Sequence, residues 1–314
     1  AAIHRDNLRS TEAGLKYFIL GALSSGLLLY GASLVYGYAG ATGFAAIAEA
    51  LDAPELSMGL VTGMVMMTAG LAFKISAAPF HMWAPDVYEG APTPVTAFFA
   101  IVPKIAGFAL VMRVFMGAFG QIDEMWRQVI IALSVLSMAV GAVAALAQTN
   151  IKRLLAYSSI GHMGYALIGL ASATHAGVTA VIVYLTLYMA MSIGVFCVVL
   201  MMRKQGRAVE GIADFAGLAK TRPGLAIAMA LLMFSMAGIP PLAGFFGKLF
   251  IFQSAVAAGF YALAIFGVLT SVVAAYYYLR IIKVMDFDES DEAWDVNDDR
   301  MLRAILLVSV LFIS

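Results

Sequence analysis

The chain has 314 residues, of which 62% are hydrophobic and only 12% are charged, and its formal net charge is zero. A soluble domain carries about 25% charged residues, so this composition, with a mean hydropathy of +0.92, excludes an ordinary soluble enzyme. A neutral chain also gives no electrostatic reason to expect a nucleic-acid partner. The single cysteine, Cys197, lies in apolar sequence and cannot alone supply a disulfide or an iron–sulfur site.

Long apolar segments follow one another from one end of the chain to the other. A helix that crosses a membrane needs about 20 consecutive apolar residues. We therefore predict an all-α polytopic membrane protein with a single transmembrane domain over residues 1–314. Its eight predicted spans and the start of a ninth are 13–37, 57–79, 94–116, 128–147, 152–172, 177–202, 224–256, 259–282 and 301–314.

The two ends of the sequence are unusual. The first residues, AAIHRDNLRSTEAG, contain no methionine and do not follow the pattern of a signal peptide. The last apolar run, MLRAILLVSVLFIS, is too short to span a membrane. We expect the chain to be a piece of a longer protein.

Basic residues are distributed unevenly between the two sides that these spans define. The side of the N-terminus collects thirteen of them, and the other side only Arg113 and Arg127. Because connections rich in Lys and Arg remain in the cytoplasm, we predict a cytoplasmic N-terminus. The thirteen are Arg5, Arg9, Lys152, Arg153, Arg203, Lys204, Arg207, Lys220, Arg222, Arg280, Lys283, Arg300 and Arg303.

Four basic residues remain inside the predicted spans, and all four are lysines: Lys16, Lys74, Lys104 and Lys248. A charged side chain at the centre of a membrane costs roughly 2.5–3.5 kcal/mol on insertion scales, so such a residue is by default functional. A desolvated lysine can lose its proton, whereas an arginine stays charged. The set predicts a proton relay, with structural ion pairs as the simpler alternative.

Two spans are interrupted by prolines close to one of these lysines. Pro79 follows Lys74, and Pro240 and Pro241 precede Lys248 in AGIPPLAGFFGK. Proline cannot continue a helix, and non-helical backbone at membrane depth is tolerated only where it is buried in protein or lines a cavity. We predict two broken helices, near Pro79 and over 238–244, in the manner of transporters built from inverted repeats.

Two further polar groups are weaker candidates. His162 shares one predicted helical face with Ser158 and Tyr165, at spacings i, i+4 and i+7. Such a stripe is typical both of helix–helix contacts in membranes and of a proton wire that uses an imidazole, and both interpretations stay open. Glu12 and Lys16 are four residues apart at a helix start, in the order that favours an ion pair.

Four stretches carry a resemblance to a known family: RSTEAGLKYFILGALSSGLLLYG, SAAPFHMWAPDVYEGAPTPVTAFFAIVPK, ALAQTNIKRLLAYSSIGHMGY, and MAGIPPLAGFFGK with the later YYYLRI. Through them essentially the whole chain resembles the antiporter-like membrane subunits of proton-pumping NADH:quinone oxidoreductase, respiratory complex I. The resemblance implies a bundle of fourteen helices with two inverted five-helix repeats, of which this chain would hold the sixth helix to part of the fourteenth.

The resemblance also implies roles for individual residues. Lys74 would lie on the broken seventh helix, Lys104 on the eighth, His162 on the tenth and Lys248 on the broken twelfth, all on the proton path. The family pairs the lysine of the seventh helix with a glutamate on the fifth helix, which lies outside this chain. Glu12 matches a different acidic position, so we do not give it that role.

The implied function is proton translocation in the bacterial inner membrane. Flavin, iron–sulfur clusters and quinone would belong to other subunits, and no cofactor is expected in this chain. The implied partners are the lipid bilayer and other complex I membrane subunits, including antiporter-like sisters. Two alternatives stay open: a cation/proton antiporter subunit of the multi-subunit sodium type, and a structural membrane scaffold subunit whose lysines anchor helices.

Overall fold

The computed structural model describes residues 7–52, 57–204, 206–289, 294–295 and 299–314, and these are mainly helical. In chain order the elements are α1 (Leu8–Ala39), α2 (Phe44–Ala50), α3 (Met58–Lys74), α4 (Trp83–Gly90), α5 (Thr93–Arg113) with a π-helical turn (Val114–Ala118), a 3-10 turn (Gly120–Ile122), α6 (Asp123–Leu146), α7 (Ile151–Ala171), α8 (His175–Met201), β1 (Arg203–Lys204), β2 (Arg207–Ala208), a 3-10 turn (Ala213–Phe215), α9 (Leu218–Thr221), α10 (Pro223–Ala237), α11 (Ala243–Ala257), α12 (Tyr261–Phe287) and α13 (Arg300–Ile313).

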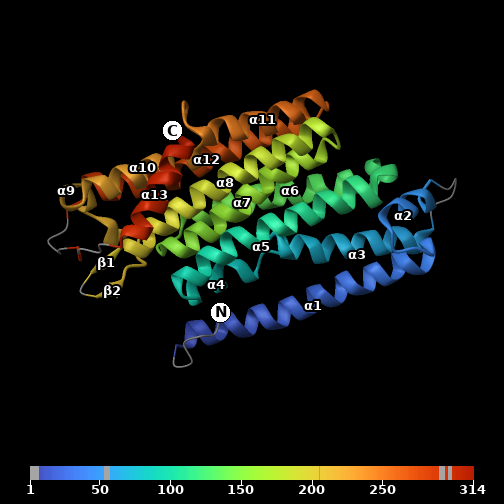
Figure 1. The fold of residues 1–314 in the computed structure, drawn as a ribbon, viewed down its shortest axis with the longest axis horizontal. Helices are drawn as coiled ribbons and strands as arrows, with labels where there is room; N and C mark the ends of the chain where they lie inside the picture. Colours follow the sequence, from blue (N-terminus) through green and yellow to red (C-terminus); the bar gives the residue numbers. More distant parts are fainter. Residues whose placement is uncertain (1–6, 53–56, 205, 290–293, 296–298) are drawn as a thin grey trace.

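The long helices run side by side and form an elongated bundle (Figure 1). Six of the helical segments that the structure describes are long and apolar enough to cross a membrane. Two further apolar segments, α3–α4 and α10–α11, are each divided by a break. These eight segments coincide with the eight predicted ranges to within a few residues at most ends, and α13 coincides with the ninth. The predicted all-α membrane fold, with its two broken helices, is confirmed.

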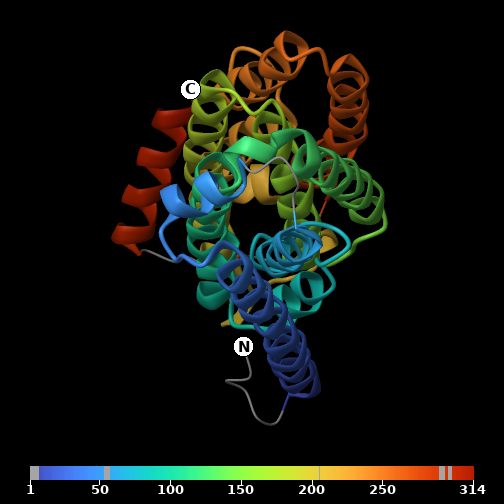
Figure 2. The ribbon, with the colours of Figure 1, turned by 90° about the vertical axis from the view of Figure 1, so that its right-hand side faces the viewer.

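Helix α7 lies in the middle of the bundle. In its most apolar stretch 94% of the residues are buried, compared with 17% in α1, which lies with α13 at the periphery (Figure 2). Small residues allow this close packing, because a Cβ atom added to Gly141 of α6 would lie 2.5 Å from the backbone nitrogen of Gly161 in α7. Polar side chains on α7 therefore face protein.

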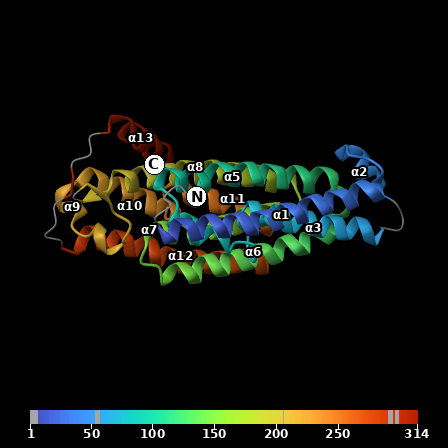
Figure 3. The same cartoon turned by 90° about the horizontal axis from the view of Figure 1, so that it is seen from below.

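The two ends of the bundle differ in their connections. The strands β1 and β2, helix α9 and the start of α1 lie toward one end, whereas α2 lies at the other end (Figure 3). Most of the predicted cytoplasmic Lys and Arg residues belong to the first end; Arg5 lies outside the described residues.

One placement made from the sequence is wrong. We counted Lys152, the first residue of the predicted span 152–172, with the basic residues of the cytoplasmic side and not with the buried lysines, but it is only 2% exposed. A distant segment covers the start of the helix, because Ile151 N donates to Glu210 O and Ile212 N donates to Thr149 O, both at 2.8 Å. Hydropathy is calculated over one stretch of sequence at a time, so it does not reveal that a distant segment covers a residue.

Candidate functional site

The first broken helix ends at Lys74, the last residue of α3. Residues 75–82 leave helical geometry before α4 begins. Trp83 Nε1 donates to the carbonyl of Phe73 at 3.0 Å, so a neighbouring side chain satisfies one of the carbonyls that a helix end leaves without an intrahelical partner. The break predicted beside Lys74 is therefore present.

The Lys74 side chain is only half-buried. It lines a groove of about 480 Å³ whose other lining residues, among them Gly14, Tyr17 and Ser25, come from α1. Within the described part of the chain Lys74 makes no ion pair, and Glu12 binds Lys16 at 2.5 Å instead. An acidic partner for Lys74 on sequence outside this chain stays a prediction.

Lys104 on α5 is fully buried, with 0% of its surface exposed. Its Nζ donates a short hydrogen bond to Ser159 Oγ on α7 and lies 5.2 Å from the centre of the Tyr88 ring on α4. A cation over an aromatic face is attracted by the ring quadrupole. No carboxylate of the described residues pairs with Lys104, so a hydroxyl and an aromatic ring provide its contacts.

His162 on α7 is hydrogen-bonded at both ring nitrogens. Nδ1 lies 2.7 Å from Tyr184 Oη and Nε2 lies 3.0 Å from Tyr278 Oη. The same Tyr278 hydroxyl lies 2.6 Å from Ser158 Oγ. A neutral imidazole has one donor and one acceptor nitrogen, so exchange of the tautomer reverses the direction of this hydrogen-bonded chain. The predicted stripe exists, since Ser158 and His162 share one partner.

Lys248 is held by the second break. Helix α10 ends at Ala237, and Gly238 takes a left-handed conformation with φ 87°. Lys248 Nζ donates to the carbonyls of Met236 and Ala237 at 3.0 and 2.9 Å, and to Ser271 Oγ at 2.8 Å. The C-terminus of a helix carries partial negative charge on such carbonyls. The break thus creates the site that holds the ammonium group.

Aromatic rings connect Lys104, His162 and Lys248 into one row along α7, which we call the buried row. The ring of Tyr165 lies 5.1 Å from Lys248 Nζ and 6.2 Å from the His162 ring. A cavity of about 10 Å³, lined by Ser158, Tyr188 and other residues, has the size of a single water molecule. Amine, hydroxyl and imidazole groups in such a row can accept and release protons.

Sequence reasoning missed several partners of the row: Tyr88, Ser159, Tyr184, Tyr188, Ser271 and Tyr278. A signal was present for two of them. Tyr184 and Tyr188 lie four residues apart well inside the apolar run 177–202, whereas tyrosine is usually enriched at the membrane–water interface. Tyrosines in the middle of a span therefore indicate polar contacts inside the protein.

The weaker candidates lie apart from this row. The predicted pair of Glu12 and Lys16 is present, and Lys16 Nζ also lies 2.6 Å from Asp86 Oδ2. Asp86 Oδ1 in turn binds Arg153 Nη1 at 2.7 Å. Both Glu12 and Lys16 are at least 40% exposed in their side chains, so they belong to a charged network where α1, α4 and α7 meet. A relay role for them stays a prediction.

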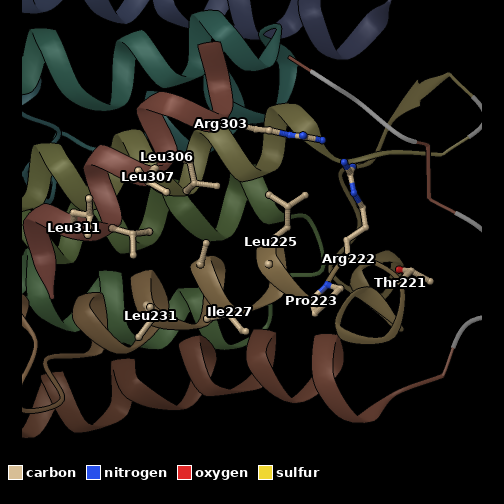
Figure 4. Close-up of a pocket in the computed structure, with 13 residues that line it drawn as sticks. Thr221, Arg222, Pro223, Leu225, Ile227, Leu231, Arg303, Leu306, Leu307 and Leu311 are labelled. Atoms are coloured by element: carbon tan, nitrogen blue, oxygen red, sulfur yellow. The ribbon is translucent and has the colours of Figure 1, made fainter. Parts of the chain in front are cut away.

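A second apolar groove lies apart from the buried row. It has a volume of about 590 Å³ and lies between α10 and α13, where leucines such as Leu225 and Leu306 form its walls (Figure 4). Arg222 and Arg303 lie at one end. None of the candidate relay lysines lines this groove.

The chain is similar to proteins of known type. The profile of the family described as "NADH:quinone oxidoreductase/Mrp antiporter, TM" matches residues 1–274. A protein of Rhodospirillum rubrum named NADH-quinone oxidoreductase subunit N is 62% identical over 98% of this chain and 63% of its own length. The chain thus spans less than two thirds of that relative.

Solved structures show the same fold. A chain in the structure titled "Respiratory complex I from Thermus thermophilus with bound Aureothin" is 35% identical, with a TM-score of 0.85 over 99% of this chain and 67% of that one. A chain in the structure of an Mrp complex from Dietzia is 25% identical, with a TM-score of 0.80 over 91% of this chain and 52% of that one.

Proposed function

Because the chain belongs to the NADH:quinone oxidoreductase/Mrp antiporter transmembrane family, we propose that it is part of a proton-translocating membrane subunit of an NADH:quinone oxidoreductase. The relatives named subunit N, at 55–62% identity, favour this enzyme over the antiporter. The proposed location is the bacterial inner membrane, with the N-terminus of this chain on the cytoplasmic side.

The observation that carries the proposal is the pair of buried lysines joined by α7. Lys104 is 0% exposed and Lys248 is 5% exposed, and within the described residues neither is paired with a carboxylate. An unpaired buried charge is costly, whereas a lysine can also be neutral when buried. Two such lysines with hydroxyl and imidazole groups between them are the arrangement that a proton relay requires.

In the proposed mechanism, protons pass from Lys74 at the first break to Lys104. They then move along the hydroxyls and His162 of the central row to Lys248 at the second break, and leave on the opposite side of the membrane. Each transfer breaks one N–H or O–H bond and forms another on the next group. Like charges disfavour each other's protonation, so a proton that arrives at Lys104 promotes release from Lys248.

The energy for this transfer comes from redox chemistry elsewhere in the proposed complex. Flavin, iron–sulfur clusters and quinone are assigned to other subunits, and none to this chain. The proposed partners are other membrane subunits of the complex, including antiporter-like sisters, together with the lipid bilayer.

The test replaces Lys104 or Lys248 by methionine in the full-length subunit within the assembled complex. Methionine keeps most of the side-chain volume but cannot carry a proton. We expect proton transfer through this subunit to fall by about 100-fold or more, the usual contribution of a positioned proton-transfer group. The measurement is the number of protons pumped per NADH oxidised in proteoliposomes.

Lys220→Met is the matched control, because Lys220 forms an exposed ion pair with Glu289 and its side chain is 66% exposed. Normal proton pumping per NADH by an assembled Lys104→Met complex would contradict the relay. Failure of both lysine variants to assemble, with a normal control, would instead support the scaffold alternative.

A further inference from the structure

A third buried lysine among the described residues is not used by the relay described above. Lys152, in the first turn of α7, is 2% exposed. Its Nζ lies 2.5 Å from Glu210 Oε1 and donates to the carbonyl of Ala91 at 3.1 Å. The Glu210 side chain is 35% exposed, compared with 3% for Lys152. One member of the pair therefore reaches the surface and the other does not.

Backbone pairing with the residues before α7 fixes the position of Glu210. Residues 210–212 pair with residues 149–151, through a bridge between Asn150 and Gly211 and the hydrogen bond from Ile151 N to Glu210 O. Asn150 Nδ2 also donates to Glu210 Oε2 at 3.4 Å. Asn150 and Gly211 line a polar groove of about 350 Å³. Glu210 thus lies beside a solvent-accessible groove at the end of the bundle that carries the basic connections.

On its inner side, Lys152 faces the elements that hold Lys104. Ala91, whose carbonyl binds Lys152, follows α4 by one residue, and Tyr88 one turn earlier lies against Lys104. Along α7, Ser159 is seven residues after Lys152 and accepts the hydrogen bond of Lys104. Seven residues of helix rise about 10 Å, which equals three or four hydrogen-bond lengths.

We infer that Glu210 and Lys152 form a second proton-uptake point of this subunit and deliver protons toward Lys104. This inference rests on the proposed function. It adds a route from the surface that begins at α7 and the segment around Glu210, beside the route through Lys74.

The steps conserve charge and need no further reactant. The Lys152 ammonium releases a proton inward when Lys104 is neutral, so an N–H bond breaks at Lys152 and one forms at Lys104 through the groups between them. The Glu210 carboxylate then takes a proton from a hydronium ion of the solvent, which leaves water, and passes this proton to the neutral Lys152 amine. Glu210 returns to its charged form, and one proton has moved from the surface to Lys104.

The experiment separates a relay from an ion pair that only holds the helices together. Lys152→Arg keeps the positive charge and the pair with Glu210, but an arginine does not release its proton. Glu210→Gln removes the proton acceptor, whereas Glu210→Asp keeps a carboxylate. Each variant is made in the full-length subunit of the assembled complex, and protons pumped per NADH are measured in proteoliposomes at equal content of complex.

We expect Lys152→Arg and Glu210→Gln to slow uptake through this route by about 100-fold, which lowers the protons pumped per NADH to what the route through Lys74 supplies. Glu210→Asp should retain more pumping than Glu210→Gln. Lys220→Arg in the exposed pair with Glu289 is the control and stays at the wild-type value. Normal pumping by Lys152→Arg overturns the inference, because charge pairing alone is then sufficient.

If Lys152→Arg does not assemble, the two Glu210 variants test the uptake point. Equal pumping by Glu210→Gln and Glu210→Asp overturns the inference. Lys104→Met, measured in parallel, distinguishes failure of the uptake point from failure of the proposed function. Loss of pumping in Lys104→Met with normal pumping in both Lys152→Arg and Glu210→Gln contradicts only this uptake point. Normal pumping in Lys104→Met contradicts the proposed function itself.

Discussion

Single hydroxyl groups hold the buried row together at the scale of residues. The hydroxyl of Tyr278 connects Ser158 Oγ at 2.6 Å with His162 Nε2 at 3.0 Å, and Tyr278 is 1% exposed. Loss of this one atom leaves two buried polar groups without that partner, at a cost of roughly 1–3 kcal/mol for each group left unsatisfied. Tyr278, which the sequence analysis did not single out, is therefore central to the buried row.

We expect Tyr278→Phe to slow proton transfer through the subunit by about tenfold or more, because the ring remains while the hydrogen-bonded chain is interrupted. Tyr276→Phe serves as the control, since Tyr276 is 61% exposed on the same helix. Both are measured as protons pumped per NADH in assembled complexes. Equal pumping by the two variants would show that protons do not pass through the Tyr278 hydroxyl.

At the scale of elements, the close packing of α6 against α7 depends on Gly141. A Cβ atom at Gly141 would lie 2.5 Å from Gly161 N and 2.8 Å from the carbonyl of Tyr157. Both are backbone atoms, so the helices would have to separate. Because α7 carries the residues of the buried row, its distance from α6 also positions Ser158 and His162.

We expect Gly141→Ala to destabilise the protein by about 1–3 kcal/mol, the usual cost of overpacking, and to lower the thermal stability of the purified complex. Gly224→Ala in α10 is the control, because no described atom lies within 4 Å of a Cβ at that position. A Gly141→Ala complex as stable as the control would mean that the bundle adjusts without strain.

The partners of the subunit decide its function at the scale of the whole molecule. The fold is shared with a chain of complex I at a TM-score of 0.85 and with a chain of an Mrp complex at 0.80, so the fold alone does not separate the two activities. In the proposed function, the redox energy is assigned to other chains. Composition of the purified assembly is therefore the most direct evidence.

We expect a tagged full-length subunit to be isolated together with subunits that contain flavin and iron–sulfur clusters, and the preparation to oxidise NADH. Absorption and paramagnetic resonance spectra of the preparation check this. Isolation with membrane-embedded partners only, without NADH oxidation, would favour the cation/proton antiporter.

The sequence by itself determined the helices, the two breaks and the four lysines within the predicted spans, of which Lys104 and Lys248 are buried. Each is a local property, because a span requires about 20 apolar residues, proline has no N–H group to continue a helix, and a lysine within an apolar run is costly wherever it lies. The ion pair of Glu12 and Lys16 was also predictable, since it lies within one helical turn.

Only the tertiary structure decided what surrounds these lysines. Ser158 and Tyr278 meet although 120 residues separate them, and the carbonyls that hold Lys248 become available because α10 ends beside it. Lys152 is buried only because a segment almost 60 residues later covers it. Contacts between distant segments depend on how helices pack, and no pattern within a single span contains that information.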